Sequence, residues 1–306
     1  MRLDDQRESS NVENQRGRVG MGMPGRGFGL PLGGSGGMGC GGLLLILIIA
    51  SVLGFNPLQF LGMSGGGDPV VVQQPTGLPG QPGIGPGALS GRPTLESETD
   101  RFVARVLATT EDTWTRVFAA NGQRYPAPKL VLYDGVGQSG CGVAQSAAGP
   151  FYCPADRKIY LDTSFFAEME RRFGAPGDFA AAYVIAHEVG HHVQLITGVA
   201  EQVQRAQQRA SRAQANALQV RMELQADCYA GVWGHDNREL LEPGDIEEAL
   251  RAASAIGDDT LMRQAGRRPV PDAFTHGTSE QRMRWFMRGY ETGDPAQCDT
   301  FSAARL

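Results

Sequence analysis

Lysine is almost absent from this chain of 306 residues, in which Lys129 and Lys158 are the only two and arginine carries nearly all the positive charge. The formal net charge is -5 and the pI is about 5.6. A nucleic-acid-binding domain needs a clustered basic surface to neutralise phosphates, and the sequence has no such cluster. We therefore expect no nucleic-acid partner.

The first hundred residues lack the apolar periodicity of packed helices and strands. Glycine and proline crowd residues 17–100, and periodic apolar residues begin only near Leu95. The expected organisation is a cytoplasmic low-complexity tail (1–37), a membrane anchor (38–60), a flexible Gly/Pro-rich linker (61–94) and one folded domain (95–306).

The predicted anchor rests on the uncharged run LLLILIIASVL at residues 43–53. Residues 38–60 are long enough to cross a hydrocarbon core of ~30 Å. Five arginines precede this segment, and the next basic residue after it is Arg92. The positive-inside rule then predicts a single-pass membrane protein, with a cytoplasmic N-terminus and the C-terminal domain on the far side of the membrane. The alternatives are a cleaved signal peptide, a lipoprotein and a buried core helix; these fit less well.

The domain contains an even number of cysteines, Cys141, Cys153, Cys228 and Cys298. In a domain outside the cytoplasm, this count favours two disulfides. Three pairings are possible, of which Cys141 with Cys153 closes the shortest loop and contributes about 3 kcal/mol in the chain-entropy model. Cys228 would then pair with Cys298. Four buried free thiols are the alternative, and a zinc cluster is disfavoured because no CxxC spacing occurs.

The stretch AYVIAHEVGHHVQ at residues 182–194 contains the pattern H-E-x-x-H. On a helix, His187 and His191 share a face, so both imidazoles can bind one Zn²⁺. Glu188 lies beside the first ligand and can reach a water on the metal as the general base. His192 points about 100° away from His191, and we expect it to pack rather than bind metal. A helix that carries histidines by coincidence is the alternative, so a third ligand is needed.

The stretch QVRMELQADCYAGVWG at residues 219–234 supplies that ligand. Glu223 and Asp227 lie one helical turn apart among apolar neighbours, where an acid is costly to bury without a partner. Glu223 is the predicted third ligand, and Asp227 is predicted to accept the free N–H of a ligand histidine. The alternative is that both acids face solvent.

Several blocks together resemble the bacterial neutral zinc metallopeptidase family, whose members carry them in the same order. The blocks are CG…GPFYCPADRKIYLD, AYVIAHEVGHHVQ, ELQADCYAGVW, GDIEEAL, IGDD, FTHGTSEQR, WF and CDTF, together with MRLDDQRESSNVENQRG at the N-terminus. The resemblance covers residues 1–55 and about 95–301. It implies a zinc-binding α+β domain, mainly helical and zincin-like, with a small β-sheet.

A more distant similarity is to gluzincin peptidases of the Ste24/HtpX type. It implies Glu223 as the third zinc ligand and Asp227 with Arg282 around the ligands. It also implies His276 as a catalytic group that stabilises the tetrahedral intermediate. Gly277 departs from this pattern, because a proline usually occupies that position.

The predicted function is that of a membrane-anchored zinc endopeptidase acting on polypeptides. Together with the bacterial family resemblance, the predicted anchor implies a single-pass protein of the bacterial inner membrane, with a cytoplasmic N-terminus and a periplasmic or extracellular C-terminal domain. An exposed edge strand would hold the substrate, either at Phe151–Tyr152 or at Ile159–Leu161. The alternatives are a catalytically silent zinc scaffold or chaperone-like protein, and a zinc amidase acting on cell-wall peptides. The sequence leaves the substrate, the oligomeric state and any partner open.

Overall fold

The computed structural model describes residues 1–17, 95–146, 149–173 and 177–306. Its strands are β1 (Val12–Asn14), β2 (Lys129–Leu132), β3 (Val136–Ser139), β4 (Gly142–Gln145), β5 (Phe151–Cys153) and β6 (Lys158–Leu161). Its α-helices are α3 (Glu98–Ala120), α4 (Ser164–Phe173), α5 (Asp178–Ile196), α6 (Val199–Gln207), α7 (Arg212–Asp236), α8 (Asp245–Ala255), α9 (Asp258–Gln264) and α10 (Ser279–Thr292). Short 3₁₀ turns are η2 (Arg238–Leu240), η3 (Pro271–Ala273) and η4 (Pro295–Cys298). The expected α+β class, mostly helical with a small sheet, is confirmed.

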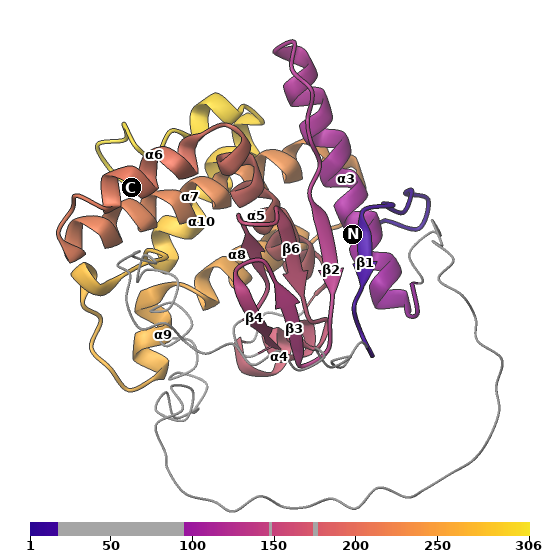
Figure 1. Cartoon of the computed structure of the whole chain (residues 1–306), viewed down its shortest axis with the longest axis horizontal. Helices are drawn as coiled ribbons and strands as arrows, with labels where there is room; N and C mark the ends of the chain where they lie inside the picture. The colour runs from indigo at the N-terminus through magenta and orange to yellow at the C-terminus, as the bar shows by residue number, and fades with distance from the viewer. Residues whose placement is uncertain (18–94, 147–148, 174–176) are drawn as a thin grey trace, which may run out of the picture.

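The main sheet has the strand order β1-β2-β6-β5. Strands β1, β2 and β6 are parallel, and β5 pairs with β6 in the antiparallel direction. Strands β3 and β4 form a separate antiparallel hairpin (Figure 1). Because β5 ends the sheet, one of its edges lacks a strand partner among the described residues.

The two central strands are apolar on both faces. In β2, Leu130 to Leu132 are all 0% exposed, and in β6, Ile159 to Leu161 are at most 1% exposed. Such continuous burial is typical of parallel strands covered on both sides. Of the two predicted edge candidates, residues 159–161 therefore lie inside the sheet and Phe151–Tyr152 lies at its edge.

Both disulfides have the expected pairing. Cys141 is bonded to Cys153, which joins the β3–β4 hairpin to the end of β5. Cys228 is bonded to Cys298, which joins α7 to the C-terminal residues.

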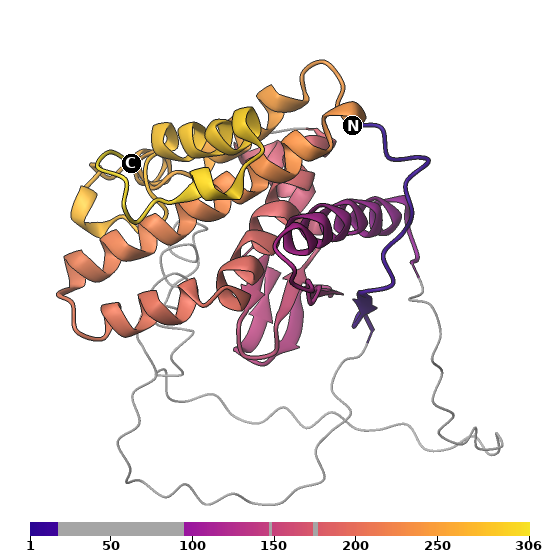
Figure 2. The ribbon, with the colours of Figure 1, turned by 90° about the horizontal axis from the view of Figure 1, so that it is seen from above.

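Helices α7 and α10 run side by side (Figures 1 and 2) and touch at their backbones. A Cβ atom on Gly231 would lie 2.0 Å from the carbonyl oxygen of Phe286, and one on Gly289 would lie 1.9 Å from that of Cys228. No side chain fits at either position, so glycine sets the distance between the two helices.

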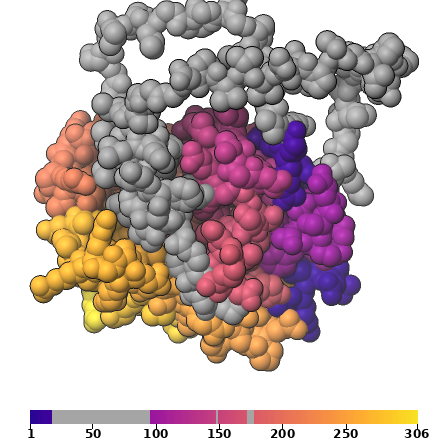
Figure 3. Space-filling view, turned by 90° about the horizontal axis from the view of Figure 1, so that it is seen from below, coloured from indigo at the N-terminus to yellow at the C-terminus, as the bar shows by residue number. Residues whose placement is uncertain are grey.

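The N-terminal residues 1–17 belong to the folded domain. Strand β1 adds to the sheet beside β2, with Val12 opposite Leu130. Ser9 and Asn11 both donate to the Glu111 carboxylate of α3, and Arg16 binds the buried Asp100 at 2.8 Å. The space-filling view shows the N-terminal segment, in indigo, against α3, in purple (Figure 3).

This packing differs from the predicted organisation, which assigns residues 1–37 to a separate cytoplasmic tail. The predicted anchor at 38–60 and linker at 61–94 lie outside the described residues, within which no helix is long and apolar enough to cross a membrane. A single crossing at 38–60 would put residues 1–17 and 95–306 on opposite sides of a membrane. Pairing of β1 with β2 requires them on the same side, so the structure corrects the predicted tail for residues 1–17.

Asp100 depends on Arg16 for its charge. Burial raises the pKa of this carboxyl, but Arg16 and the backbone N–H of Glu96 outweigh it and lower the pKa below 3.8. A carboxyl whose pKa is lower in the folded chain stabilises the fold above its unfolded pKa, near 3.9, and loses this contribution as the pH falls through the lowered value.

Replacing Arg16 with methionine should destabilise the protein by about 3 kcal/mol, because it leaves the Asp100 carboxylate buried without its partner. The loss of stability that accompanies protonation of Asp100 in the wild type, followed by circular dichroism at decreasing pH, should also be absent from this variant. Lys129→Met is the control: Lys129 is 54% exposed in its pair with Glu13, and its loss should cost less than about 1 kcal/mol. Equal costs for the two variants would show that residues 1–17 are not integral to the fold.

A methyl group at Gly289 should separate α7 from α10 and destabilise the protein by about 3 kcal/mol or more, because backbone atoms cannot give way as a side chain does. The matched control is Gly234→Ala in α7, where the nearest atom to the new Cβ is a Tyr290 side-chain carbon at 3.4 Å. There we expect no loss and a gain of up to about 1 kcal/mol from helix propensity. Urea unfolding of both variants measures the difference.

Candidate metal centre

The two predicted histidine ligands and the predicted base lie on α5, which is buried along most of its length. The helix ends at Ile196, and Thr197 caps it. His187 is 6% exposed and Glu188 is 7% exposed. The rings of His187 and His191 lie 4.8 Å apart between centroids. Their spacing of four residues therefore places both imidazoles on one face, as expected.

The predicted third ligand approaches from α7. Glu223 Oε2 lies 3.2 Å from His187 Nε2 and 3.5 Å from His191 Nε2. One nitrogen or oxygen atom from each of these residues lies within 4.8 Å of the others. Gly190 permits this approach, because a Cβ there would lie 3.0 Å from the Cα of Ala226 on α7. Two imidazoles and one carboxylate are a typical donor set for zinc that leaves a coordination position for a reactant.

Each of the three predicted ligands is held by a second polar residue. His187 donates from Nδ1 to Asp227 at 2.9 Å. His191 Nδ1 lies 2.9 Å from Gln194 Oε1. Glu223 Oε1 accepts a bond of 2.9 Å from Gln219. In both histidines the proton on Nδ1 leaves the Nε2 lone pair for a metal.

Asp227 is the most heavily bonded of these groups and is 0% exposed. Arg282 of α10 donates to both of its oxygens at 2.9 Å, and Tyr183 of α5 donates to it at 2.6 Å. This cluster brings together the predicted pair Asp227 and Arg282. It joins α5, α7 and α10 around one carboxylate.

The ionisation of the cluster follows from burial and close opposite charges. Burial lowers the pKa of His187, but Asp227 and Glu223 outweigh it and raise the pKa to about 9. Burial likewise opposes charge on Asp227, but Arg282 and His187 bring its pKa down to about 2. The pKa of Glu223 is also lowered, because His191 and His187 outweigh its burial. The pocket thus favours charged carboxylates, and His187 must release its proton to bind a metal.

Glu188 differs from these acids. Burial is the main influence on it and raises its pKa, although both histidines act in the opposite direction. The backbone N–H of Tyr152 in β5 stabilises its carboxylate. A buried acid with a raised pKa next to a predicted metal ligand is a candidate for proton transfer.

His276 precedes α10, and it contributes to the lowered pKa of Glu223. Its Nδ1 lies 3.2 Å from Asp258 Oδ1. Asp258 also accepts the backbone N–H groups of Thr275, His276 and Gly277. Asp258 therefore fixes the orientation of the His276 ring.

His192 packs away from the metal pocket, and it is 1% exposed. Its Nε2 donates to the carbonyl of Pro126 at 2.6 Å, and its Nδ1 accepts from the Tyr152 hydroxyl at 3.0 Å. Burial lowers its pKa to about 4. A neutral histidine with both nitrogens bonded has no position left for a metal.

Sequence reasoning missed Gln194, Gln219 and Asp258. The sequence spacing could have indicated the two glutamines. Gln194 follows His191 by three residues, and Gln219 precedes Glu223 by four. Each spacing places the two residues on one helical face. Asp258 carried no such signal, because it meets His276 across a loop.

The sequence model of the family described as "Putative neutral zinc metallopeptidase" matches residues 1–301. The chain belongs to this family. The match includes the N-terminal residues that complete the sheet. The uncharacterized protein YpfJ of Escherichia coli strain K12 is 50% identical over 304 residues, which cover 98% of this chain and 99% of that protein.

The uncharacterized protein Rv2575 of Mycobacterium tuberculosis strain H37Rv is 42% identical over 261 residues, covering 81% of this chain and 86% of that protein. No solved structure gives a significant match. The zincin-like fold and the similarity to peptidases of the Ste24/HtpX type therefore stay predictions.

Replacing Gln219 with methionine should weaken zinc binding about tenfold, because Glu223 loses the donor that holds its second oxygen. Methionine keeps the side-chain volume, so the fold should be retained. Competition with a chromophoric chelator measures the affinity. Gln204→Met, at an exposed position of α6, is the control and should bind zinc as the wild type does. Unchanged affinity in Gln219→Met would show that this bond does not orient the ligand.

Proposed function

We propose that the chain is a zinc-dependent endopeptidase, with His187, His191 and Glu223 as ligands and Glu188 as the general base. The main support is the convergence of two imidazoles and a carboxylate in a buried pocket, each with its own hydrogen-bonded partner. Only Glu188, of the acids named in this pocket, has a raised pKa. Membership of the zinc metallopeptidase family agrees with this assignment.

The residues around the pocket divide the reaction between them. Zinc, when bound, supplies a Lewis acid that polarises the peptide carbonyl and activates a water. Glu188 takes a proton from that water and passes it to the leaving amine, which its raised pKa favours. His276, oriented by Asp258, donates to the oxygen that becomes negative in the transition state. Asp227 and Gln194 keep the ligand histidines in the metal-binding tautomer.

A polypeptide substrate would bind in extended form along β5. This strand is the last in the sheet. The backbone N–H of Tyr152, in the same strand, donates to the Glu188 carboxylate. Addition of a substrate strand at such an edge satisfies main-chain hydrogen bonds whatever the side chains. The Cys141–Cys153 disulfide fixes the end of β5, so this edge is held in place before substrate arrives.

We also propose that the domain lies outside the bacterial cytoplasm, where disulfides persist. The apolar segment at 38–60 would hold the domain at the inner membrane without a single crossing. Residues 1–17 would then lie on the same side of the membrane as residues 95–306, because they share one sheet.

Glu188→Gln tests the proposed reaction. The variant should bind zinc with wild-type affinity and cleave a casein-like polypeptide about 10²- to 10⁴-fold more slowly, because the amide cannot accept the proton. Cleavage sites are read by mass spectrometry, and bound zinc by metal analysis. The control is Glu170→Gln, an exposed glutamate of α4, which should retain full activity.

Each other outcome points to a different function. Wild-type protein that binds zinc yet cleaves no polypeptide would support the zinc scaffold. Cleavage confined to muropeptides would support the cell-wall amidase. Equal rates for wild type and Glu188→Gln would remove Glu188 from the mechanism.

A further inference from the structure

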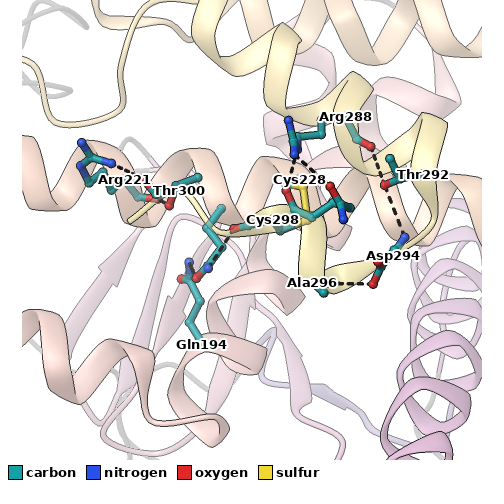
Figure 4. The surroundings of a disulfide bond; sticks show 11 residues. Gln194, Arg221, Cys228, Arg288, Thr292, Asp294, Ala296, Cys298 and Thr300 are labelled. Carbon is teal, nitrogen blue, oxygen red and sulfur yellow. Dashed lines mark hydrogen bonds between the residues drawn. A yellow bond between two sulfur atoms is a disulfide. The ribbon is translucent and has the colours of Figure 1, made fainter. Parts of the chain in front are cut away.

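Two buried glutamines connect the ligand His191 with the C-terminal disulfide. Gln194 of α5 is 0% exposed, and Gln225 of α7 is 5% exposed. Gln194 Nε2 donates to Gln225 Oε1 at 3.1 Å, and Gln225 Nε2 donates to the carbonyl oxygen of Cys298 at 3.0 Å. Figure 4 shows Gln194 below the bonded pair of Cys228 and Cys298.

Two backbone carbonyls, those of Cys298 and Met222, fix the direction of each bond in this chain. The carbonyl oxygen of Cys298 can only accept, so Gln225 must turn its NH₂ group toward it and its oxygen toward Gln194. Gln194 then uses its NH₂ group for Gln225 Oε1 and for the carbonyl of Met222 at 2.7 Å. Both donors of Gln194 are thereby occupied.

Only the carboxamide oxygen of Gln194 remains for His191. This oxygen lies 2.9 Å from His191 Nδ1, and because it cannot donate, Nδ1 must carry the proton. The lone pair of Nε2 then faces the metal position beside Glu223. A rotated Gln194 amide would instead offer N–H to Nδ1 and favour the tautomer whose protonated Nε2 cannot bind a metal.

The Cys298 carbonyl is held in place by bonds between α7 and residues 295–303, here called the C-terminal strap. The disulfide with Cys228 fixes Cys298 itself, which is 0% exposed. Thr300 donates to the carbonyl of Arg221 at 2.7 Å, and Arg221 donates back to the carbonyl of Thr300. The strap thus follows α7 over the turns that carry Glu223 and Asp227 on another face.

We propose that Gln194 and Gln225 are positioning residues for the metal ligand His191, and that the Cys228–Cys298 disulfide fixes the carbonyl that orients Gln225 and, through it, supports the orientation of Gln194 that the Met222 carbonyl also favours. The disulfide is then a determinant of metal retention as well as of stability. This inference rests on the proposed ligand set but not on peptide cleavage.

Zinc affinity, measured by chelator competition on the full chain with folding checked by circular dichroism, tests the proposal. Gln225→Met should weaken zinc binding about tenfold while keeping all three ligands. Gln202→Met is the matched control. Gln202 is exposed, and like Gln225 it lines a cavity of about 560 Å³ between α6, α7 and the C-terminal strap. This variant should bind zinc as the wild type does.

The two disulfides provide a second comparison within one chain. Replacing Cys228 and Cys298 together with serine should weaken zinc binding by a factor similar to that of Gln225→Met. Replacing Cys141 and Cys153 together should leave zinc affinity within about twofold of wild type, because that bridge touches no ligand partner. The cobalt-substituted protein gives a further readout, since its visible absorption bands should change in the first variant alone.

Combining the substitutions separates positioning from general loosening. If Gln225 and the disulfide act through the same bonds, adding Gln225→Met to the Cys228/Cys298 variant should cause no further loss of affinity. Fully additive losses, equal losses for both disulfide variants, or wild-type affinity in Gln225→Met would each overturn the proposal. Glu188→Gln in the same assay should leave the zinc affinity unchanged. A failure of the proposed peptidase reaction therefore remains distinct from a failure of Gln194 and Gln225 to position His191.

Discussion

The buried carboxylate of Asp227 is the constraint on which the arrangement of the three central helices depends. A carboxylate with no exposed surface must be matched by hydrogen-bond donors. Here they come from Tyr183 and His187 on α5 and from Arg282 on α10. The donor on α10 reaches it because Gly231 and Gly289 let the backbones of α7 and α10 touch, and the α5 donors reach it because Gly190 lies against Ala226. The helix packing and the metal pocket are therefore consequences of one electrostatic requirement, and neither can be altered without the other.

The same principle extends outward through the second polar layer. Each proposed ligand is held by a residue on its own helix or on a neighbouring one, and the partners of His191 continue to the C-terminal strap. Such layers restrict the rotation of ligands before a metal arrives, which reduces the conformational entropy lost on binding. The raised pKa of Glu188 has its own cause, because burial disfavours its charged form more than the two nearby histidines favour it.

Much of the site was predictable, because its signals are local. The spacing of four residues between His187 and His191, and between Glu223 and Asp227, places each pair on one helical face whatever the tertiary structure. The burial of two acids on an apolar helix predicts a partner on energetic grounds. Asp258 could not be predicted in this way, because its meeting with His276 depends on a loop whose course follows from the packing of α9 and α10.

The position of residues 1–17 was also beyond local reasoning. Their sequence is polar, and β1 has only three residues, so neither periodicity nor length marks a strand. Its partner β2 is distant, and Val12 lies opposite Leu130. At the usual synthesis rate of ~5–20 residues per second, β1 leaves the ribosome roughly 6 to 24 seconds before β2 is made. During that interval β1 has no neighbouring strand, so completion of the sheet is a late, long-range step of folding and depends on keeping the first residues of the chain away from other partners.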